Sequence, residues 1–325
     1  MSAPDLDTVA APSRPPPLLT EAQLQQICRQ GYLDLDLAST AVYKDLDGLF
    51  ANSSTFLDLP TERKAQLYPS IPGDTEHGYS HIPDEKEFLT LRYRPSAQCT
   101  EKPSDEEERV CADLEGLMER VWNDLARLLH RMLHDISAYL GSIDPSAWDP
   151  LISESLQLPS SREAATPTLL RVFRYYAERG VAEPHRDLGL LTVCVTRGKG
   201  LQLWDRLGPP SPKEEADRSR PSQDRWRDAG EITVMVGDTL RVLSGNRVPA
   251  AAHRVIATDK GRSSIVFALR SSLRSTIDLE DFGGYGQVKA RVLWNEIRKS
   301  RVNVNAQRDA REEQIAKNRK GASIA

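Results

Sequence analysis

The second half of the chain, from Pro167 onward, contains seven short runs rich in Val, Ile, Leu, Thr and aromatic residues. Turn residues such as Gly198 and Gly200 separate these runs. Many short runs at close intervals predict the β-strands of a sandwich or of a barrel-like jelly roll. The predicted strands span residues 169–176, 190–195, 201–204, 231–236, 239–243, 252–257 and 263–269.

Helical periodicity flanks this strand region on both sides. The strongest signal covers residues 105–140, where apolar residues recur mostly at three- and four-residue steps, as on an amphipathic helix that packs on a sheet. Helices are also predicted within 38–68 and 287–317, whereas 69–81 is predicted to be a loop. The sequence therefore predicts an α+β fold, with N-terminal helices and a C-terminal helix around a β core.

Length and composition fit one ordinary globular domain. The 325 residues are 39% hydrophobic and 28% charged. The formal net charge of −4 gives no basic surface for nucleic acid, so we exclude that class of partner. No apolar run approaches the roughly 18 residues that cross a bilayer, and the four cysteines form no C-x-x-C pair. We expect a cytoplasmic protein without a membrane partner, and the oligomeric state stays open.

Composition also divides the chain. Residues 1–18 are rich in Pro, Ala and Ser and are predicted to be a disordered arm before a single domain over 19–325. A polar insertion over 209–228 interrupts the predicted strands and is expected to form a loop. The parts of the domain are a mainly helical region over 19–160, the jelly-roll core over 165–275 and a C-terminal helical region over 280–318.

One histidine and one aspartate in the strand region could bind a metal ion together. On an extended strand, residues i and i+2 point to the same side, so His185 and Asp187 can reach one ion. Further along, His253 lies in another strand-like run. Two histidines and one carboxylate suit Fe(II), because three protein ligands leave positions open for other molecules. A chance H-x-D pair is the alternative for His185 and Asp187 alone.

A basic and a hydroxyl side chain open the last predicted strand. Arg262 and Ser264 are also i and i+2, so they face the same side. A guanidinium with a neighbouring hydroxyl is a good receptor for a carboxylate inside a barrel. Arg186 and Arg254 alternate with the candidate ligands and should point outward.

Two further histidines, His130 and His134, lie four residues apart within the long predicted helix. This spacing can bind metal, but no glutamate follows His130 as in an H-E-x-x-H motif. We interpret both as solvated surface residues.

These motifs together resemble the isopenicillin N synthase-like family of Fe(II)/2-oxoglutarate-dependent oxygenases. The Pro-His-Arg-Asp-Leu-Gly segment that begins at Pro184 carries the resemblance most clearly, with the His-Arg-Val and Arg-Ser-Ser segments that follow. The similarity covers roughly residues 20–315. The segments that contribute are 184–192, 200–203, 236–240, 253–255 and 262–264, together with 56–64, 77–80, 86–88, 303–305 and 311–314.

The resemblance implies a double-stranded β-helix, a distorted jelly roll, as the core. It implies that His185, Asp187 and His253 bind Fe(II), and that 2-oxoglutarate chelates the iron while its far carboxylate meets Arg262 and Ser264. A tyrosine from the preceding strand often assists in this family. Tyr175 and Tyr176 are both candidates, and we take Tyr175 first.

The implied activity is O₂-dependent oxidation of a small organic molecule in secondary metabolism, by hydroxylation, desaturation or ring formation. One alternative is an oxidase like isopenicillin N synthase that does not use 2-oxoglutarate. Such an enzyme would use Arg262 and Ser264 to bind the carboxylate of its substrate. Another alternative is a non-catalytic binding protein on the same fold.

Overall fold

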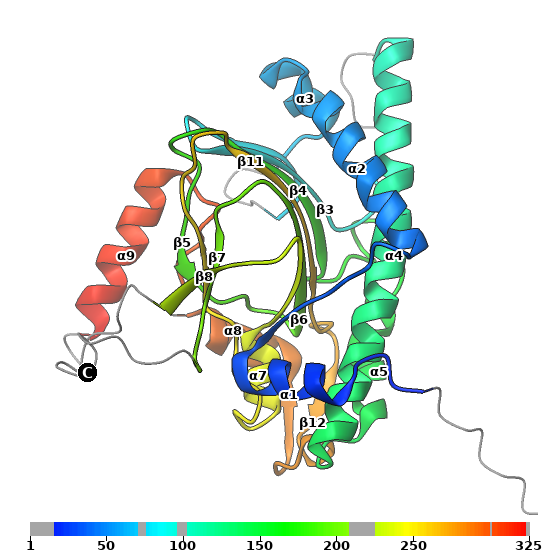
Figure 1. Ribbon diagram of the computed structural model, residues 1–325, viewed down its shortest axis with the longest axis vertical. Coiled ribbons are helices and arrows are strands. Elements are labelled where there is room, and N and C mark those ends of the chain that lie inside the picture. The colour runs from blue at the N-terminus through cyan, green and yellow to red at the C-terminus, as the bar shows by residue number, and fades with distance from the viewer. Residues whose placement is uncertain (1–15, 71–75, 96–102, 208–224, 300, 323–325) are drawn as a thin grey trace, which may run out of the picture.

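The chain forms two antiparallel β-sheets with helices packed around them (Figure 1). The structure is a computed structural model, and it describes residues 16–70, 76–95, 103–207, 225–299 and 301–322. The predicted arm over 1–18 lies mostly outside the part of the chain that the structure describes, and so does most of the predicted insertion over 209–228.

The larger sheet has seven strands and the smaller has four, and they form the two walls of a jelly roll. Side chains from both sheets meet in an inner apolar cluster, which includes Phe173 from one sheet and Leu203 from the other. The predicted double-stranded β-helix is therefore confirmed. In sheet order, the strands of the larger sheet are β1 (Tyr32–Asp34), β9 (Ile232–Val236), β6 (Leu191–Arg197), β11 (Arg262–Leu269), β4 (Leu169–Tyr175), β3 (Lys86–Leu91) and β2 (Gly78–Ile82). Those of the smaller sheet are β5 (Ala182–His185), β10 (His253–Val255), β7 (Leu201–Trp204) and β8 (Trp226–Asp228).

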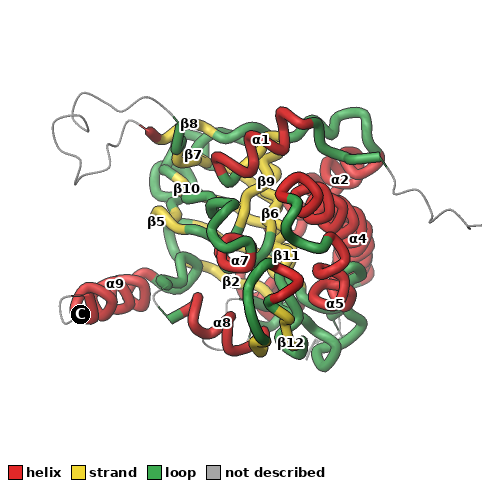
Figure 2. Tube along the Cα trace, turned by 90° about the horizontal axis from the view of Figure 1, so that it is seen from below, coloured by secondary structure: helices red, strands yellow, loops and turns green. Residues whose placement is uncertain are grey.

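Helices cover the outer face of the larger sheet, and Figure 2 shows this layer order from below. The helix α4 (Asp105–Leu140) packs on this face, with Trp122 against Phe267 at a ring-centroid distance of 5.2 Å. Its bounds match the prediction, because a capping box at Ser104 begins it and Gly141, with φ +69°, ends it. The other helices are α1 (Glu21–Gln30), α2 (Ala41–Leu57), α3 (Thr61–Leu67), α5 (Asp149–Ile152), α7 (Asp238–Leu243), α8 (Ala290–Arg298) and α9 (Arg308–Ala322).

Alternate side chains of each central strand point to opposite faces of the larger sheet, one set under the helices and the other between the two sheets. On β11, Ile265 and Phe267 belong to the cluster under the helices, whereas Arg262 and Ser264 line the space between the sheets. The same alternation places Tyr175 of β4 toward the inner space. Two layers of packing therefore hold the inward-facing polar side chains on rigid strands.

The structure corrects several predicted elements. The predicted strand over 239–243 belongs instead to the helix α7, because a short apolar run does not distinguish the two periods. The predicted loop over 69–81 contains the start of β2, and the mainly helical N-terminal region also provides β3. Within 287–317, residues Gln287–Lys289 form the strand β13, which pairs with β12 (Thr276–Asp278) before the helices begin.

Candidate metal centre

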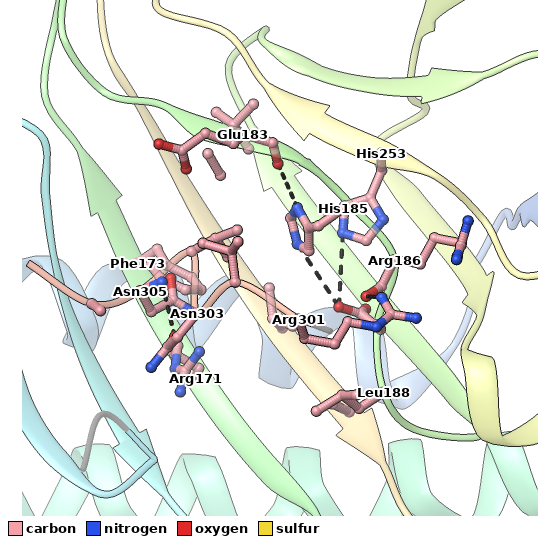
Figure 3. Close-up of a pocket in the computed structure, with 18 of the residues that line it drawn as sticks. Arg171, Phe173, Glu183, His185, Arg186, Leu188, His253, Arg301, Asn303 and Asn305 are labelled. Carbon is pink, nitrogen blue, oxygen red and sulfur yellow. Dashed lines mark hydrogen bonds and ion pairs between the residues drawn. The ribbon is translucent and has the colours of Figure 1, made fainter. Parts of the chain in front are cut away.

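The predicted ligands His185, Asp187 and His253 lie together at one end of the smaller sheet (Figure 3). His185 ends β5 and His253 begins β10, and the two residues face each other in the antiparallel pairing. The Asp187 Oδ1 lies 3.9 Å from the His185 Nε2 and 3.8 Å from the His253 Nε2. Three ligand atoms thus surround a space of the size that a metal ion needs, and all lie within 4.8 Å of one another.

Backbone carbonyls fix the orientation of both imidazoles. The His185 Nδ1 lies 2.7 Å from the Glu183 carbonyl, and the His253 Nδ1 lies 3.2 Å from the Ala251 carbonyl. An Nδ1–H that donates to a carbonyl leaves Nε2 unprotonated and directed at the ion. Burial, and then the charge of His253, lower the pKa of His185 to about 3, so this imidazole is neutral and able to bind a metal.

The carboxylate of Asp187 is held ionised. Burial alone would raise its pKa, but the neighbouring groups, His253 first among them, outweigh this effect and the pKa is lowered. The Asp187 carbonyl also accepts a hydrogen bond from the backbone N–H of Asp238 at 2.8 Å. This bond fixes the turn after β5, so the aspartate is aligned with the histidine two residues earlier.

A buried cation lies across the space between the two sheets from the candidate ligands, in one cavity with them. Arg262, at the start of β11, is only 6% exposed, and its Nε, Nη1 and Nη2 have no hydrogen-bond partner among the described residues. The neighbouring Cys194 thiol cannot neutralise it, because burial raises the pKa of this thiol to about 11. Ser264, two residues along the strand, is also buried and lines the cavity.

The two tyrosine candidates point in different directions. Tyr175 pairs with Arg262 across the sheet, and the Arg262 guanidinium lies 5.3 Å from the centre of its ring. Tyr176 directly follows the end of β4, with its ring 6.1 Å from that of His81. Only Tyr175 of the two lines the large cavity, so it is the one placed to assist, although its role stays a prediction.

The cavity has a volume of about 1970 Å³ and is bounded on one side by the segment after α8. Arg301 of this segment lies beside the candidate ligands, whereas Asn303 and Asn305 lie near Arg171 (Figure 3). The family resemblance includes residues 303–305 but gives them no place in the site, because no periodicity or motif relates residues 301–307 to a strand more than 100 positions earlier.

Ion pairs attach this C-terminal segment to the helix α7 and to the turn between β2 and β3. Arg301 contacts Asp238, which is fully buried and also pairs with Arg186 and Arg241. Arg311, on the charged helix α9, is only 3% exposed and binds Glu85 at 2.8 Å.

The two arginines next to the candidate ligands do not reach the ligand cluster, as the strand alternation predicts. The Arg254 guanidinium lies 4.4 Å from the centre of the Trp226 ring. The Arg186 Nε lies 3.3 Å from the Asp238 Oδ2. Neither cation therefore neutralises the Asp187 carboxylate.

Lys86 provides another contact to the segment. Its Nζ donates to the Val304 carbonyl at 2.8 Å, and burial, and then the Arg311 charge, lower the pKa of Lys86 to about 7. The folded protein therefore binds fewer protons than the unfolded chain between pH 7 and the ordinary lysine pKa of 10.5.

We expect wild-type stability, relative to a Lys86→Met variant, to rise by about 1.4 kcal/mol per pH unit above pH 7. The penalty of burying the charge is complete below pH 7 and becomes smaller as the pH rises toward the ordinary lysine pKa of 10.5, because removing the proton on folding then costs less. Urea unfolding of both proteins at pH 7, 8 and 9 measures this slope. A constant difference between them across this range would contradict the neutral state of Lys86.

Comparison with known proteins gives independent information about this cavity. Residues 167–271 match the family described as the 2OG-Fe(II) oxygenase superfamily, a range that includes all six predicted site residues. The oxidoreductase vrtI of Penicillium aethiopicum is 30% identical over 140 residues, which are 42% of this chain and 31% of that protein. The 2-oxoglutarate-dependent dioxygenase iboH of Amanita muscaria is 35% identical over 105 residues, 31% of this chain and 46% of that protein. The chain thus matches less than half of the length of these relatives.

Solved structures share the fold. The match to a full-length Neurospora crassa protein, solved in complex with alpha-KG, covers 86% of this chain and 90% of that one, with a TM-score of 0.62 and 18% identity. Within the described residues, no helix is long and apolar enough to cross a membrane. Residues 167–271 are thus similar to the 2OG-Fe(II) oxygenase superfamily, and the named relatives include a 2-oxoglutarate-dependent dioxygenase.

Proposed function

We propose that this protein is an Fe(II)/2-oxoglutarate-dependent dioxygenase that oxidises a small organic molecule in the cytoplasm. In this proposal His185, Asp187 and His253 bind the iron, and Arg262 with Ser264 binds the far carboxylate of 2-oxoglutarate. Tyr175 lies beside Arg262 and would complete that receptor.

The unpartnered guanidinium of Arg262 is the observation that carries the proposal. A buried cation without a counter-ion costs several kcal/mol, and a bound dianion removes this cost. Arg262 lines the cavity that contains the three candidate iron ligands. A small dicarboxylate can therefore contact the iron at one end and the guanidinium at the other.

The donor set fits Fe(II). Two imidazole nitrogens and one carboxylate are the ligands of non-haem iron oxygenases, and they leave positions open for 2-oxoglutarate and O₂. When bound, these groups would oxidise a C–H bond of the substrate while 2-oxoglutarate is converted to succinate and CO₂.

The protein itself would orient the bound molecules and exclude water. Arg262 and Ser264 on a central strand fix one end of 2-oxoglutarate, and the segment around Asn303 closes one side of the cavity. Water exclusion strengthens the charge interactions inside and suppresses side reactions.

The substrate proposal rests on the cavity and on the relatives. A volume of about 1970 Å³ exceeds the roughly 300–1,000 Å³ typical of a small-ligand pocket, so the substrate can be larger than 2-oxoglutarate. Several matching proteins come from fungi, including those of Penicillium and Amanita. A secondary metabolite is therefore the substrate class we propose, with hydroxylation, desaturation or ring formation as outcomes.

Measuring succinate separates this proposal from the oxidase alternative. Purified protein with Fe(II) should release succinate from 2-oxoglutarate in air, and a panel of candidate substrates should accelerate the release. Oxygen consumption with substrate that does not depend on 2-oxoglutarate would instead support an oxidase. Absence of both reactions in a folded sample that binds iron would support a non-catalytic protein.

A further inference from the structure

A second cluster of two histidines and one carboxylate lies away from the candidate iron centre. His130 and His134 come from α4, and Asp149 is the first residue of α5. Their ligand atoms lie within 4.8 Å of one another. The helix α4 packs on the face of the larger sheet that is opposite the smaller sheet, so the sheet separates this cluster from the cavity (Figure 1).

The helix itself aligns the two imidazoles. Residues four apart on an α-helix lie one above the other on the same face, and the rings of His130 and His134 are 4.4 Å apart. Both Nε2 atoms point to the same oxygen, the Asp149 Oδ1, at 2.6 Å from His130 and 3.1 Å from His134. Sequence spacing alone predicts two solvated histidines, because nothing in it relates Asp149 to this helix.

Packing of the preceding residue fixes Asp149 opposite the helix. Trp148 is completely buried, and its Nε1 donates to the Ser137 Oγ of α4 at 2.7 Å. The Trp148 ring also packs against Phe282 at 4.8 Å. The backbone beside Asp149 is therefore attached to α4, while its own side chain is 51% exposed and can rotate.

We propose that His130, His134 and Asp149 form a second metal site, which binds a divalent transition-metal ion of the zinc type. Imidazole nitrogens exclude Mg²⁺ and Ca²⁺ as preferred ions, whereas zinc, nickel and copper bind such sets. Three protein ligands and one water complete the tetrahedron that zinc adopts.

The observed distances between the three side chains allow a metal ion to replace their direct hydrogen bonds. Tetrahedral ligands at about 2.0–2.2 Å from zinc lie about 3.4 Å from one another. The His134 contact of 3.1 Å is already close to this value, and the His130 contact of 2.6 Å requires Asp149 to withdraw by about 0.8 Å. A half-exposed carboxylate can make this movement. The bound ion would then link the C-terminal half of α4 to α5.

The test counts zinc ions on untagged protein in a competition titration with a chelating indicator. Wild-type protein should take up two equivalents of Zn²⁺, since the candidate iron centre also accepts zinc. The double variant His130→Ala/His134→Ala and the single variant His253→Ala should each take up one, and their combination none. Co²⁺ in place of Zn²⁺ should give visible absorption bands of a tetrahedral site that the double variant lacks.

Asp149→Asn keeps a hydrogen-bond acceptor for the histidines but removes the charged ligand. It should therefore lower the affinity of the second site for zinc by about tenfold or more. Asp124→Asn, which removes an exposed carboxylate of the same helix that pairs with Arg127, should bind both equivalents as wild type does. Equal uptake by wild type and the double variant would overturn the proposal. A result in which only His253→Ala loses an equivalent of zinc would overturn it as well. The equivalent that His253→Ala loses reports on the candidate iron centre alone.

Discussion

Replacement of Arg262 by methionine should strongly weaken 2-oxoglutarate binding and at the same time stabilise the ligand-free protein. The buried guanidinium has no hydrogen-bond partner among the described residues, so it destabilises the ligand-free fold. Methionine fills a similar volume without a charge, and we expect the free energy of unfolding to rise by about 1–3 kcal/mol. Loss of a buried charge pair with the ligand costs about 2–5 kcal/mol, which raises the KM for 2-oxoglutarate about 30-fold or more.

Added 2-oxoglutarate should reverse this order of stability. With Mn(II) in place of iron, a ligand at 100 times its Kd stabilises the wild type by about 2.7 kcal/mol. The variant should gain little, because it cannot bind the far carboxylate. Thermal unfolding with and without 2-oxoglutarate measures both parts of the prediction.

Arg254→Met is the matched control. Arg254 lies on β10 beside a candidate ligand, but it points outward to Gln202 and Trp226. This variant should keep the KM for 2-oxoglutarate and show no gain in stability. If Arg262→Met bound 2-oxoglutarate as tightly as the wild type, the proposed receptor would be wrong, whatever its stability.

The strand region was the most predictable part of the fold, because inward and outward side chains alternate with a period of two. The structure places Arg262 and Ser264 on one face of β11, as this period predicts, and Ile265 on the other. The long helix was predictable for a different reason. Its apolar stripe is continuous, and Ser104 and Gly141 mark its two ends.

Strands that contain buried charged residues were not predicted from the sequence. Glu87 of β3 is only 2% exposed, but it contacts Lys64 and accepts a hydrogen bond from the Tyr79 hydroxyl at 2.6 Å. A charged residue in a strand is predicted to be exposed unless its buried partner is known. Here the partner, Lys64, comes from a helix 23 positions away in the sequence. The C-terminal side of the cavity escaped for the same reason, because Arg311 finds Glu85 only in the folded chain.

Replacement of His253 by alanine should remove iron binding and reduce turnover to background. His253 is buried and contributes one of only three protein ligands in the candidate centre. Loss of a supporting hydrogen bond to a metal ligand already costs about 10–100-fold in metal affinity, so loss of the ligand itself should cost more. Anaerobic titration with Fe(II), followed through the visible band that appears with 2-oxoglutarate, measures the affinity.

His81→Ala is the control for removal of a histidine from the cavity wall. His81 lines the same cavity, but it lies at the sheet edge near Tyr176 and is not part of the ligand cluster. It should bind Fe(II) as wild type does. His185→Ala should match His253→Ala, because the two residues face each other across β5 and β10 and bind the same ion. Unchanged iron binding in both ligand variants would show that iron binds outside this cluster. The zinc titration of the same variants distinguishes this cluster from the one on α4.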